Sequence, residues 1–317
     1  MNAVDILRNG HQTEVTAVAN LPEEQRIALS QKDFLAKQNR LKLMCILAHP
    51  DDESLGTGGI LAKYAAEGVH TSVITATRGQ QGWPGDPAAN PGPEALGQLR
   101  AGELRAAADV LGVQELILLD YMDGELDEVD WETAVSQIAH YIRLLQPHVV
   151  VTFDPYGAYG HPDHIAISQM TMAAIVAASS SNGAQPPHQV AKLYYMADTA
   201  EIAHLYEDIF GELVMTIDDE ERRMVSWPRW AITTRIETAA YLPQIWQAIS
   251  CHRSQLPGYN MLVQLPLEQR HRLYGQQSFY RAFSLVNGGR TVENDLFDGL
   301  RENETHLQGA KDGIVGD

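Results

Sequence analysis

The stretch LMCILAHPDDE at residues 43–53 decides the fold, because an apolar run passes directly into a group of polar side chains. Such a run is typical of a strand that is buried on both faces, as in a parallel sheet. His49, Asp51 and Asp52 then follow where the strand should end. An imidazole and two carboxylates at this place predict a metal site with a base beside it.

A second polar group follows another apolar strand further along the chain. Residues 149–153 read VVVTF, and a loop rich in Gly and Tyr leads to HPDH at residues 161–164. Ligands of an open parallel sheet bind outside the carboxyl ends of its strands. We therefore expect the two polar groups to converge on one ion.

The chain from Leu41 onward predicts strands and helices in alternation. We expect strands over 41–48, 71–77, 115–119 and 148–153, and helices over 58–68, 94–111, 131–145 and 163–180. This order predicts an α/β fold with a Rossmann-like, mostly parallel sheet and helices on both faces. The later pattern predicts strands at 190–196 and 278–286, an extended piece near 212–217 and a helix over 238–252. It therefore predicts a smaller C-terminal α+β part.

The length of 317 residues and this pattern predict one large domain with appendages. We assign residues 41–298 to the α/β domain, residues 1–40 to an N-terminal helical extension and residues 299–317 to a flexible acidic tail. The sequence GTGG at residues 56–59 follows a strand, as a dinucleotide loop would. The third glycine of that fingerprint is replaced by Leu61, so a dinucleotide site is not predicted.

Charge and hydropathy exclude several classes of partner. The formal net charge of -18 would repel nucleic acid and anionic lipid surfaces. The sequence contains no apolar run of the roughly 20 residues that a membrane helix needs. Residues 1–10 do not show a basic head followed by an apolar core, so we do not expect a secretion signal there. Cys45 and Cys251 are the two cysteines, and Cys45 lies within an apolar strand pattern, as a buried thiol would. We expect a cytoplasmic protein with no nucleic-acid or membrane partner.

The polar groups supply what a catalytic zinc needs, namely three nitrogen or oxygen ligands and an open position for water. We expect His49, Asp52 and His164 to be those ligands. Asp51 is left over and would act as the general base. His161 would face the substrate, where it stabilises the oxyanion or protonates the departing nitrogen, and Asp163 would hold a ring nitrogen of His161.

Four further residues have two interpretations each. The hydroxyl of Tyr159 either contacts the tetrahedral intermediate or lies in a packed surface loop. Arg78 either binds a polar part of the substrate or is a solvated charge, and Asp123 either bonds sugar hydroxyls or makes a turn. His252 either reaches the substrate or ends a helix, where a cation is favourable.

Several of these motifs together resemble the LmbE/PIG-L family of zinc-dependent N-deacetylases. The resemblance covers about residues 41 to 285 and rests on AHPDDE at 48–53, YGHPDH at 159–164 and HRSQ at 252–255. It implies a Rossmann-like fold and removal of acetyl from an N-acetylglucosamine-type small molecule or a related amide. It also implies zinc on His49, Asp52 and His164, with Asp51 as base and His161 as acid or oxyanion partner.

Two other functions use the same residues. Two imidazoles and one carboxylate also form the facial triad of non-haem Fe(II) oxygenases, and the ligands accept Fe²⁺ or Mn²⁺ as well as Zn²⁺. A sugar-binding protein without turnover would keep the same scaffold, although the spare Asp51 argues for catalysis. The sequence leaves open the aglycone of the substrate and the choice between a monomer and a homo-oligomer.

Overall fold

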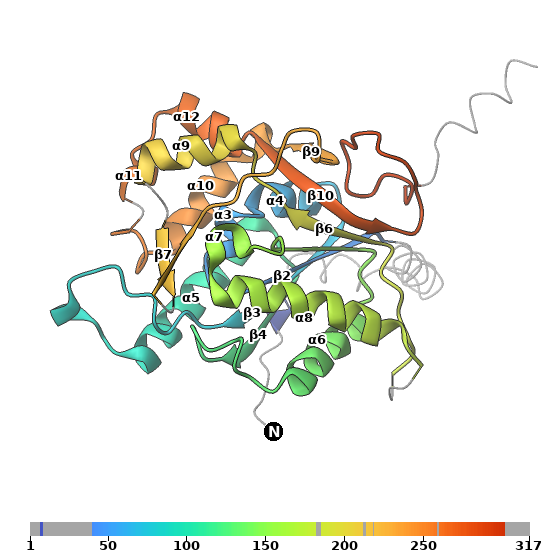
Figure 1. Cartoon of the computed structure of the whole chain (residues 1–317), viewed down its shortest axis with the longest axis horizontal. Coiled ribbons are helices and arrows are strands. Elements are labelled where there is room, and N and C mark those ends of the chain that lie inside the picture. The colour runs from blue at the N-terminus through green and yellow to red at the C-terminus, as the bar shows by residue number, and fades with distance from the viewer. Residues whose placement is uncertain are drawn as a thin grey trace, which may run out of the picture.

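The computed structural model describes residues 7–8, 40–181, 185–211, 214–217, 219–258 and 260–301. Within these ranges an 8-stranded sheet forms the centre of the molecule, in the order β1-β4-β3-β2-β5-β6-β10-β9 (Figure 1). The parallel strands are β2 (Lys42–Leu47), β3 (His70–Thr77), β4 (Glu115–Tyr121), β5 (Val149–Thr152) and β6 (Lys192–Met196). Antiparallel pairing adds β10 (Gln276–Ser284) beside β6, β9 (Thr234–Glu237) beside β10, and β1 (Leu7–Arg8) beside β4. The predicted mostly parallel sheet is confirmed.

Four crossover helices follow the strands as the sequence predicts. They are α4 (Gly58–Ala66), α5 (Pro93–Leu111), α6 (Trp131–Leu145) and α8 (Pro162–Ser179). Asp130 caps α6 by accepting a hydrogen bond from the Thr133 amide, and Gly112 ends α5 in the left-handed conformation. Helix α6 packs on α8, while α5 packs on α4 and on α10 (Leu242–Cys251). The helices therefore form two groups, as expected for layers on either side of the sheet.

The central strand β2 positions the site. Its residues from Leu43 to Leu47 are fully buried, because β2 lies between β3 and β5 and is covered by helices. The chain passes from β2 to β3 on one side, but β5 lies on the other side of β2. Such a reversal of strand order opens a crevice at the carboxyl ends of the two central strands. The two polar groups of the sequence lie at the ends of these strands.

Several short elements were not predicted. The helix α3 (Asp52–Leu55) begins inside the HPDDE motif, and α7 (Gly157–Gly160) lies in the loop before His161. Beyond β6 the structure adds α9 (Ala200–Phe210), α11 (Asn260–Val263) and α12 (Leu267–Tyr274). The extended piece predicted near 212–217 is β7 (Val214–Ile217), and its hairpin partner β8 (Glu220–Arg223) was not predicted. Single 3-10 turns, η1 (Pro87–Ala89) and η2 (Ala239–Tyr241), complete the description. Most of these elements are too short for an apolar repeat in the sequence to reveal them.

The predicted appendages lie mostly outside the described residues. Of the N-terminal 40 residues, the structure describes Leu7–Arg8, which form a short strand, and Arg40. Residues 302–317 of the predicted tail are outside the described ranges, but Arg301 forms ion pairs with Glu67 and Asp295. In the part of the chain that is described, no helix is both long and apolar enough to span a membrane.

Candidate active site

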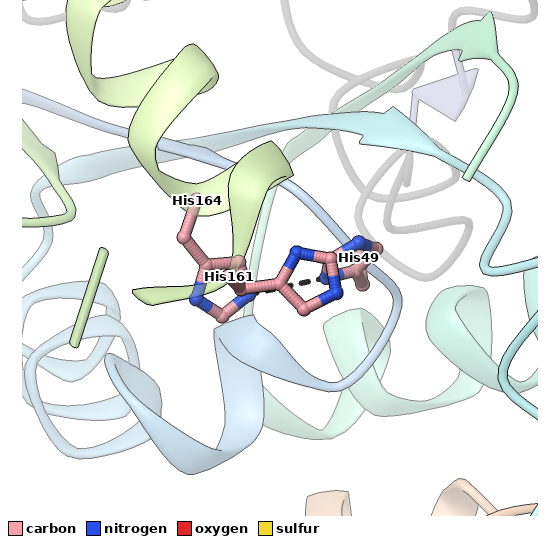
Figure 2. Close-up of side chains that lie close together, drawn as sticks. All are labelled: His49, His161 and His164. Carbon is pink, nitrogen blue, oxygen red and sulfur yellow. Dashed lines mark hydrogen bonds between the residues drawn. The ribbon is translucent and has the colours of Figure 1, made fainter. Parts of the chain in front are cut away.

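Two imidazoles meet at the carboxyl ends of β2 and β5 (Figure 2). His49 lies two residues after the end of β2, and His164 lies in the first turn of α8. The Nδ1 atom of His49 and the Nε2 atom of His164 are 3.1 Å apart, and both residues are buried. The predicted convergence of the two motifs is therefore present.

Asp52 lies beside both rings. Its Oδ2 atom accepts hydrogen bonds from the amides of Ala48 and His49, at 3.2 and 2.7 Å. Oδ2 is also 3.8 Å from His49 Nδ1, and Oδ1 is 3.5 Å from His164 Nε2. Ligands of a tetrahedral zinc ion with bonds of about 2.0–2.1 Å lie about 3.3 Å from one another. The two ring nitrogens are thus spaced as two ligands of one small cation would be, and the Asp52 carboxylate approaches each of them with a different oxygen.

Two sets of side chains among the described residues have the spacing of metal ligands, and neither of them contains Asp52. One is His49, His161 and His164, and the other is His49, Asp123 and Asp163, with ligand atoms within 4.8 Å of one another. His161 stacks on His164, with the ring centroids 4.8 Å apart. Two further imidazoles and three carboxylates therefore lie around His49, which is a donor set suited to a divalent cation.

The second nitrogen of His49 is held by two carboxylates. Nε2 lies 3.0 Å from Asp163 Oδ2 and 3.0 Å from Asp123 Oδ1. Burial lowers the pKa of His49, but the bonds to Asp123 and Asp163 outweigh this effect and raise it to about 10. Such an arrangement fixes the ring and leaves Nδ1 directed at His164.

The prediction that Asp163 holds His161 through its carboxylate is wrong. That carboxylate instead faces His49, and it also accepts hydrogen bonds from the amides of Gly124 and Leu126. His161 is bound through the backbone, because its Nδ1 atom accepts the Asp163 amide at 3.2 Å. A neutral His161 then carries its proton on Nε2. Burial and the neighbouring His49 lower the pKa of His161 to about 4.

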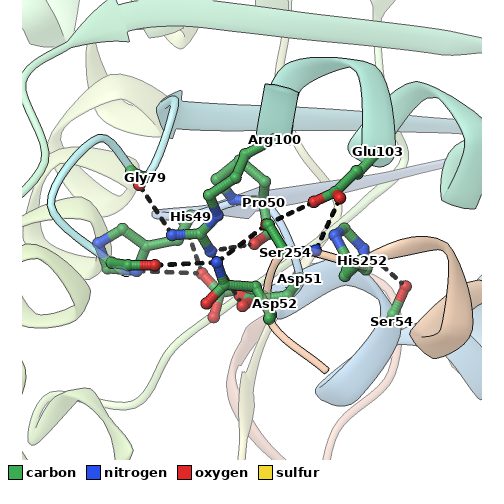
Figure 3. A network of polar contacts seen from close by, with 12 residues as sticks. His49, Pro50, Asp51, Asp52, Ser54, Gly79, Arg100, Glu103, His252 and Ser254 are labelled. Atoms are coloured by element: carbon green, nitrogen blue, oxygen red, sulfur yellow. Dashed lines mark hydrogen bonds and ion pairs between the residues drawn. The ribbon is translucent and has the colours of Figure 1, made fainter. Parts of the chain in front are cut away.

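Asp51 is held in an unusual conformation on the cavity wall (Figure 3). Its φ of 122° lies in the region that side-chain-bearing residues rarely adopt. The Asp51 amide donates to Glu53 Oε2 at 2.9 Å, and Arg100 Nη2 lies 3.0 Å from Asp51 Oδ2. Arg100 also donates to the carbonyls of Pro50 and Gly79. The buried guanidinium thus fixes both the turn and the carboxylate of Asp51.

A buried pair lies behind Asp51. His252 Nε2 is 2.7 Å from Glu53 Oε1, and both side chains are fully buried. The interpretation of His252 as a substrate-binding residue is therefore replaced by a structural one, because its ring faces Glu53 and does not line the cavity. Glu103 is also held by the segment that contains His252, because its carboxylate accepts hydrogen bonds from the amide and the hydroxyl of Ser254 (Figure 3). Sequence analysis did not select Arg100 or Glu103. They are three positions apart on the predicted helix over 94–111, and this spacing, which places both on one face, could have indicated that they act together.

The other three predicted residues have different positions. Tyr159 and Asp123 line the cavity. Arg78 does not line it and is paired with Asp120, with one nitrogen to oxygen distance of 3.0 Å. Burial raises the pKa of Tyr159, so its hydroxyl stays protonated. Hydrogen bonding to His49 outweighs burial and lowers the pKa of Asp123 to about 2, so Asp123 is charged.

These groups open into a cavity of about 510 Å³, a size typical of small-molecule sites. His49, Asp51, Asp52, His161 and His164 all contribute to its lining. The arrangement combines a cluster of metal-ligating groups with a fixed carboxylate on one wall. Such a site can hold a cation, bind a small molecule and accept a proton.

Comparisons with known proteins identify the family of this chain. Residues 44–175 match the family model described as GlcNAc-PI de-N-acetylase (PIG-L). A 1D-myo-inositol 2-acetamido-2-deoxy-alpha-D-glucopyranoside deacetylase of Streptomyces griseus is 39% identical over 82% of this chain and 89% of its own length. An enzyme of the same name from Kineococcus radiotolerans is 36% identical over 82% of this chain and 83% of its own length.

Solved structures show the same fold at lower identity. N,N'-diacetylchitobiose deacetylase from Pyrococcus horikoshii superposes with a TM-score of 0.57 at 18% identity, over 82% of this chain and 93% of that one. The conserved protein TT1542 from Thermus thermophilus gives a TM-score of 0.56 at 24% identity, over 78% and 97%. The resemblance seen in the sequence motifs is confirmed by the family model and by both curated relatives. The chain therefore belongs to the PIG-L family of de-N-acetylases.

Proposed function

We propose that this protein is a metal-dependent hydrolase that removes the acetyl group from a small 2-acetamido-2-deoxyglucose derivative. The observation that carries the proposal is the fixed carboxylate of Asp51 on the cavity wall beside the converging His49, Asp52 and His164. The names of the curated relatives supply the acetamido sugar as the substrate class.

We assign a single cation, Zn²⁺, to His49, Asp52 and His164. The 3.1 Å distance between the two ring nitrogens supports this set, and the Asp52 carboxylate beside both rings supplies a negative charge that stabilises a bound divalent ion. When bound, the ion would polarise the amide carbonyl and lower the pKa of a coordinated water. The same ligands also accept Fe²⁺, so metal analysis of the purified protein belongs to the test.

In this proposal Asp51 accepts the proton of the attacking water and then passes it to the departing nitrogen, so that the C–N bond breaks to give acetate and the free amine. Arg100 keeps the Asp51 carboxylate in one orientation, and Glu53 binds the Asp51 amide, so that the base does not have to be ordered during the reaction. Asp51 lies next to Asp52 in the chain, which places the base adjacent to the proposed cation. Positioning of a base in this way contributes typically 10²–10⁴-fold in rate.

His161 stabilises the negative oxygen that develops on the amide carbon. It lines the cavity, and its backbone hydrogen bond at Nδ1 leaves Nε2–H to donate to the substrate. With a pKa of about 4, the ring is neutral at pH 7, which favours the oxyanion role over donation of a full proton. Tyr159, with its hydroxyl protonated, offers a second donor from the same loop. Asp123 lines the cavity as a charged acceptor for a sugar hydroxyl.

The test is an assay of the zinc-loaded protein against a panel of N-acetylated glucosaminides. We expect release of free amine that requires the metal and continues without oxygen. Activity that stops when oxygen is removed would indicate a non-haem Fe(II) oxygenase, whose metal is held by the same types of ligand. A panel without any turnover, in protein with full metal content, would indicate a binding protein.

A further inference from the structure

The HRSQ motif at residues 252–255 begins at the end of α10. The side chains of His252 and Ser254 are buried, and neither residue lines the cavity. A substrate in the cavity would therefore not touch them. Their hydrogen bonds lead instead to Asp51, the proposed base, along two separate routes.

The first route runs from His252 to the backbone of Asp51. His252 Nε2 lies 2.7 Å from Glu53 Oε1, and the other oxygen, Glu53 Oε2, accepts the Asp51 amide at 2.9 Å. The Ser54 hydroxyl also donates to Glu53 Oε1, at 2.5 Å. His252 thus helps to fix the Glu53 carboxylate in the orientation that binds the backbone of Asp51.

The second route runs from Ser254 through α5 to the side chain of Asp51. Glu103 accepts hydrogen bonds from the amide and the hydroxyl of Ser254, at 2.8 and 2.7 Å. Arg100 precedes Glu103 by three positions on the same face of α5, and its Nη2 atom lies 3.0 Å from Asp51 Oδ2 (Figure 3). Helix α5 therefore connects the turn after α10 to the Asp51 carboxylate.

The two routes close a ring of contacts behind the cavity, which we call the support ring. Its members are Asp51, Glu53, His252, Ser254, Glu103 and Arg100, and all six are buried. Buried charged groups stabilise a fold only weakly, because the loss of water offsets much of their mutual attraction. Asp51 has a φ of 122°, and such a conformation persists only where the surroundings enforce it. The support ring is therefore explained by what it enforces, which is the conformation of the base.

We propose that His252 is a positioning residue, which acts through Glu53 to hold Asp51 in the conformation in which its carboxylate accepts the proton. This inference rests on the proposed function, in which Asp51 is the general base. Misplacement of a reacting group by about 1 Å can cost on the order of 10²-fold in rate. Because neither His252 nor Glu53 lines the cavity, loss of their contact should lower kcat and leave KM almost unchanged.

Kinetics of the zinc-loaded protein with methyl 2-acetamido-2-deoxyglucoside test the inference. His252→Leu removes the donor to Glu53, and kcat should fall about 10–10²-fold with KM within about twofold. His252→Gln restores an N–H donor and should recover most of the loss. The matched control is His188→Leu, because that imidazole bonds the Pro147 carbonyl at 2.7 Å and does not line the cavity. An unchanged kcat for His252→Leu, or an equal loss in the control, would overturn the inference.

A milder variant tests the same carboxylate if His252→Leu does not fold. Ser54→Ala removes only the hydroxyl that donates to Glu53, and alanine is compatible with the helix α3. Loss of one hydrogen bond corresponds to about fivefold, so kcat should fall by about that factor with KM unchanged. An unchanged kcat for Ser54→Ala would show that the orientation of the Glu53 carboxylate does not matter for the reaction, which overturns the inference.

A double-mutant cycle separates positioning of the base from a general role in the fold. In the Asp51→Asn protein, His252→Leu should lower the residual kcat by less than about threefold, because the group that His252 positions can no longer accept a proton. A residue that only stabilises the fold would lower kcat by the same factor in both backgrounds. That result would overturn the inference.

Hydrogen exchange of the full-length protein tests the support ring without requiring turnover. The Asp51 amide should exchange on the order of tenfold faster in His252→Leu than in the unmodified protein, because the carboxylate that binds it is no longer fixed. Mass spectrometry of a peptide that covers residues 49–55 measures this, and a peptide that covers β6 should be unchanged. Equal protection of residues 49–55 in the two proteins would overturn the inference.

These measurements let the two proposals fail separately. Release of acetate by the unmodified enzyme, with an equal kcat for folded His252→Leu, would leave the proposed function intact and refute the positioning role. Faster exchange in His252→Leu, with no acetate from the unmodified protein at full metal content, would refute the proposed function. It would retain the support ring as the element that fixes Asp51.

Discussion

The backbone of Asp51, the proposed base, is strained, and its neighbours hold it in that conformation. A φ of 122° costs on the order of 1–3 kcal/mol for a residue with a side chain, and it persists only where the surroundings enforce it. Here the surroundings are the Glu53 carboxylate on the Asp51 amide and the Arg100 guanidinium on its side chain. The contact with Arg100 could not be predicted from the motif, because Arg100 comes from the distant helix α5, whereas Glu53 belongs to the motif itself.

Asp51→Asn should therefore keep the fold and the metal but lose 10²–10⁴-fold in kcat, since the amide has the same shape and cannot accept the proton. Initial rates and zinc content of the same preparation measure both quantities. Asp127→Asn, on an exposed loop, is the control and should retain the full rate. An unchanged kcat for Asp51→Asn would remove this residue from the mechanism.

The choice among neighbouring imidazoles is also decided at the residue scale. His49→Ala, Asp52→Ala and His164→Ala should each lower the zinc content, because each removes one of three ligands. His161→Ala should keep zinc and lose activity, because it removes a donor to the substrate. Elemental analysis after dialysis distinguishes these outcomes. Zinc lost from the His161 variant and kept in the Asp52 variant would instead favour the three-histidine set.

At the scale of elements, periodic segments were predictable and short ones were not. The long helices and the buried strands have clear apolar repeats, and α6 has the predicted bounds of Trp131–Leu145. Helix α3 has four residues, which are polar in sequence except for Leu55, so no pattern could indicate it. The convergence of His49 and His164 followed from strand order, whereas the direction of the Asp163 carboxylate depends on the loop amides of Gly124 and Leu126.

The start of α4 gives a prediction at this scale. A Cβ atom on Gly59 would lie 2.6 Å from Thr238 Cγ2 and 2.7 Å from Gln277 Oε1, which bonds the Ile60 amide. Gly59→Ala should therefore destabilise the protein by about 1–3 kcal/mol. Gly102→Ala on α5 has nothing within 4 Å and should be neutral or stabilising by up to about 1 kcal/mol. Urea unfolding measures both, and equal effects of the two substitutions would contradict the close packing of α4.

At the scale of the whole molecule, a buried carboxylate joins the C-terminal strands to the sheet. Glu293 accepts hydrogen bonds from Lys192 on β6, Thr234 on β9 and Arg281 on β10, and also from Tyr194 and Asn287. Burial raises its pKa, but the bond to Lys192 and those to the other donors outweigh this effect and lower it to about 2. No sequence pattern marks this residue, because its partners come from separate segments.

The sign of the pH effect follows from this lowered pKa. Stabilisation by Glu293 is fully present above its ordinary pKa of about 4.5 and is lost as the pH falls towards 2. Glu293→Gln should destabilise the protein by about 3 kcal/mol at pH 7, because Lys192 keeps a buried charge without its partner. Between pH 5 and pH 3 the variant should lose less stability than the unmodified protein. Urea unfolding at each pH measures this, and parallel losses would exclude Glu293 as the cause.

The central claim is that water cleaves an amide in this cavity, and the label in the released acetate tests it most directly. The zinc-loaded protein is incubated with methyl 2-acetamido-2-deoxyglucoside in water enriched in oxygen-18, and acetate and amine are quantified by mass spectrometry. The account predicts equal amounts of amine and acetate, with one labelled oxygen in each acetate. Acetate without the label, or no acetate from protein with full metal content, would contradict it.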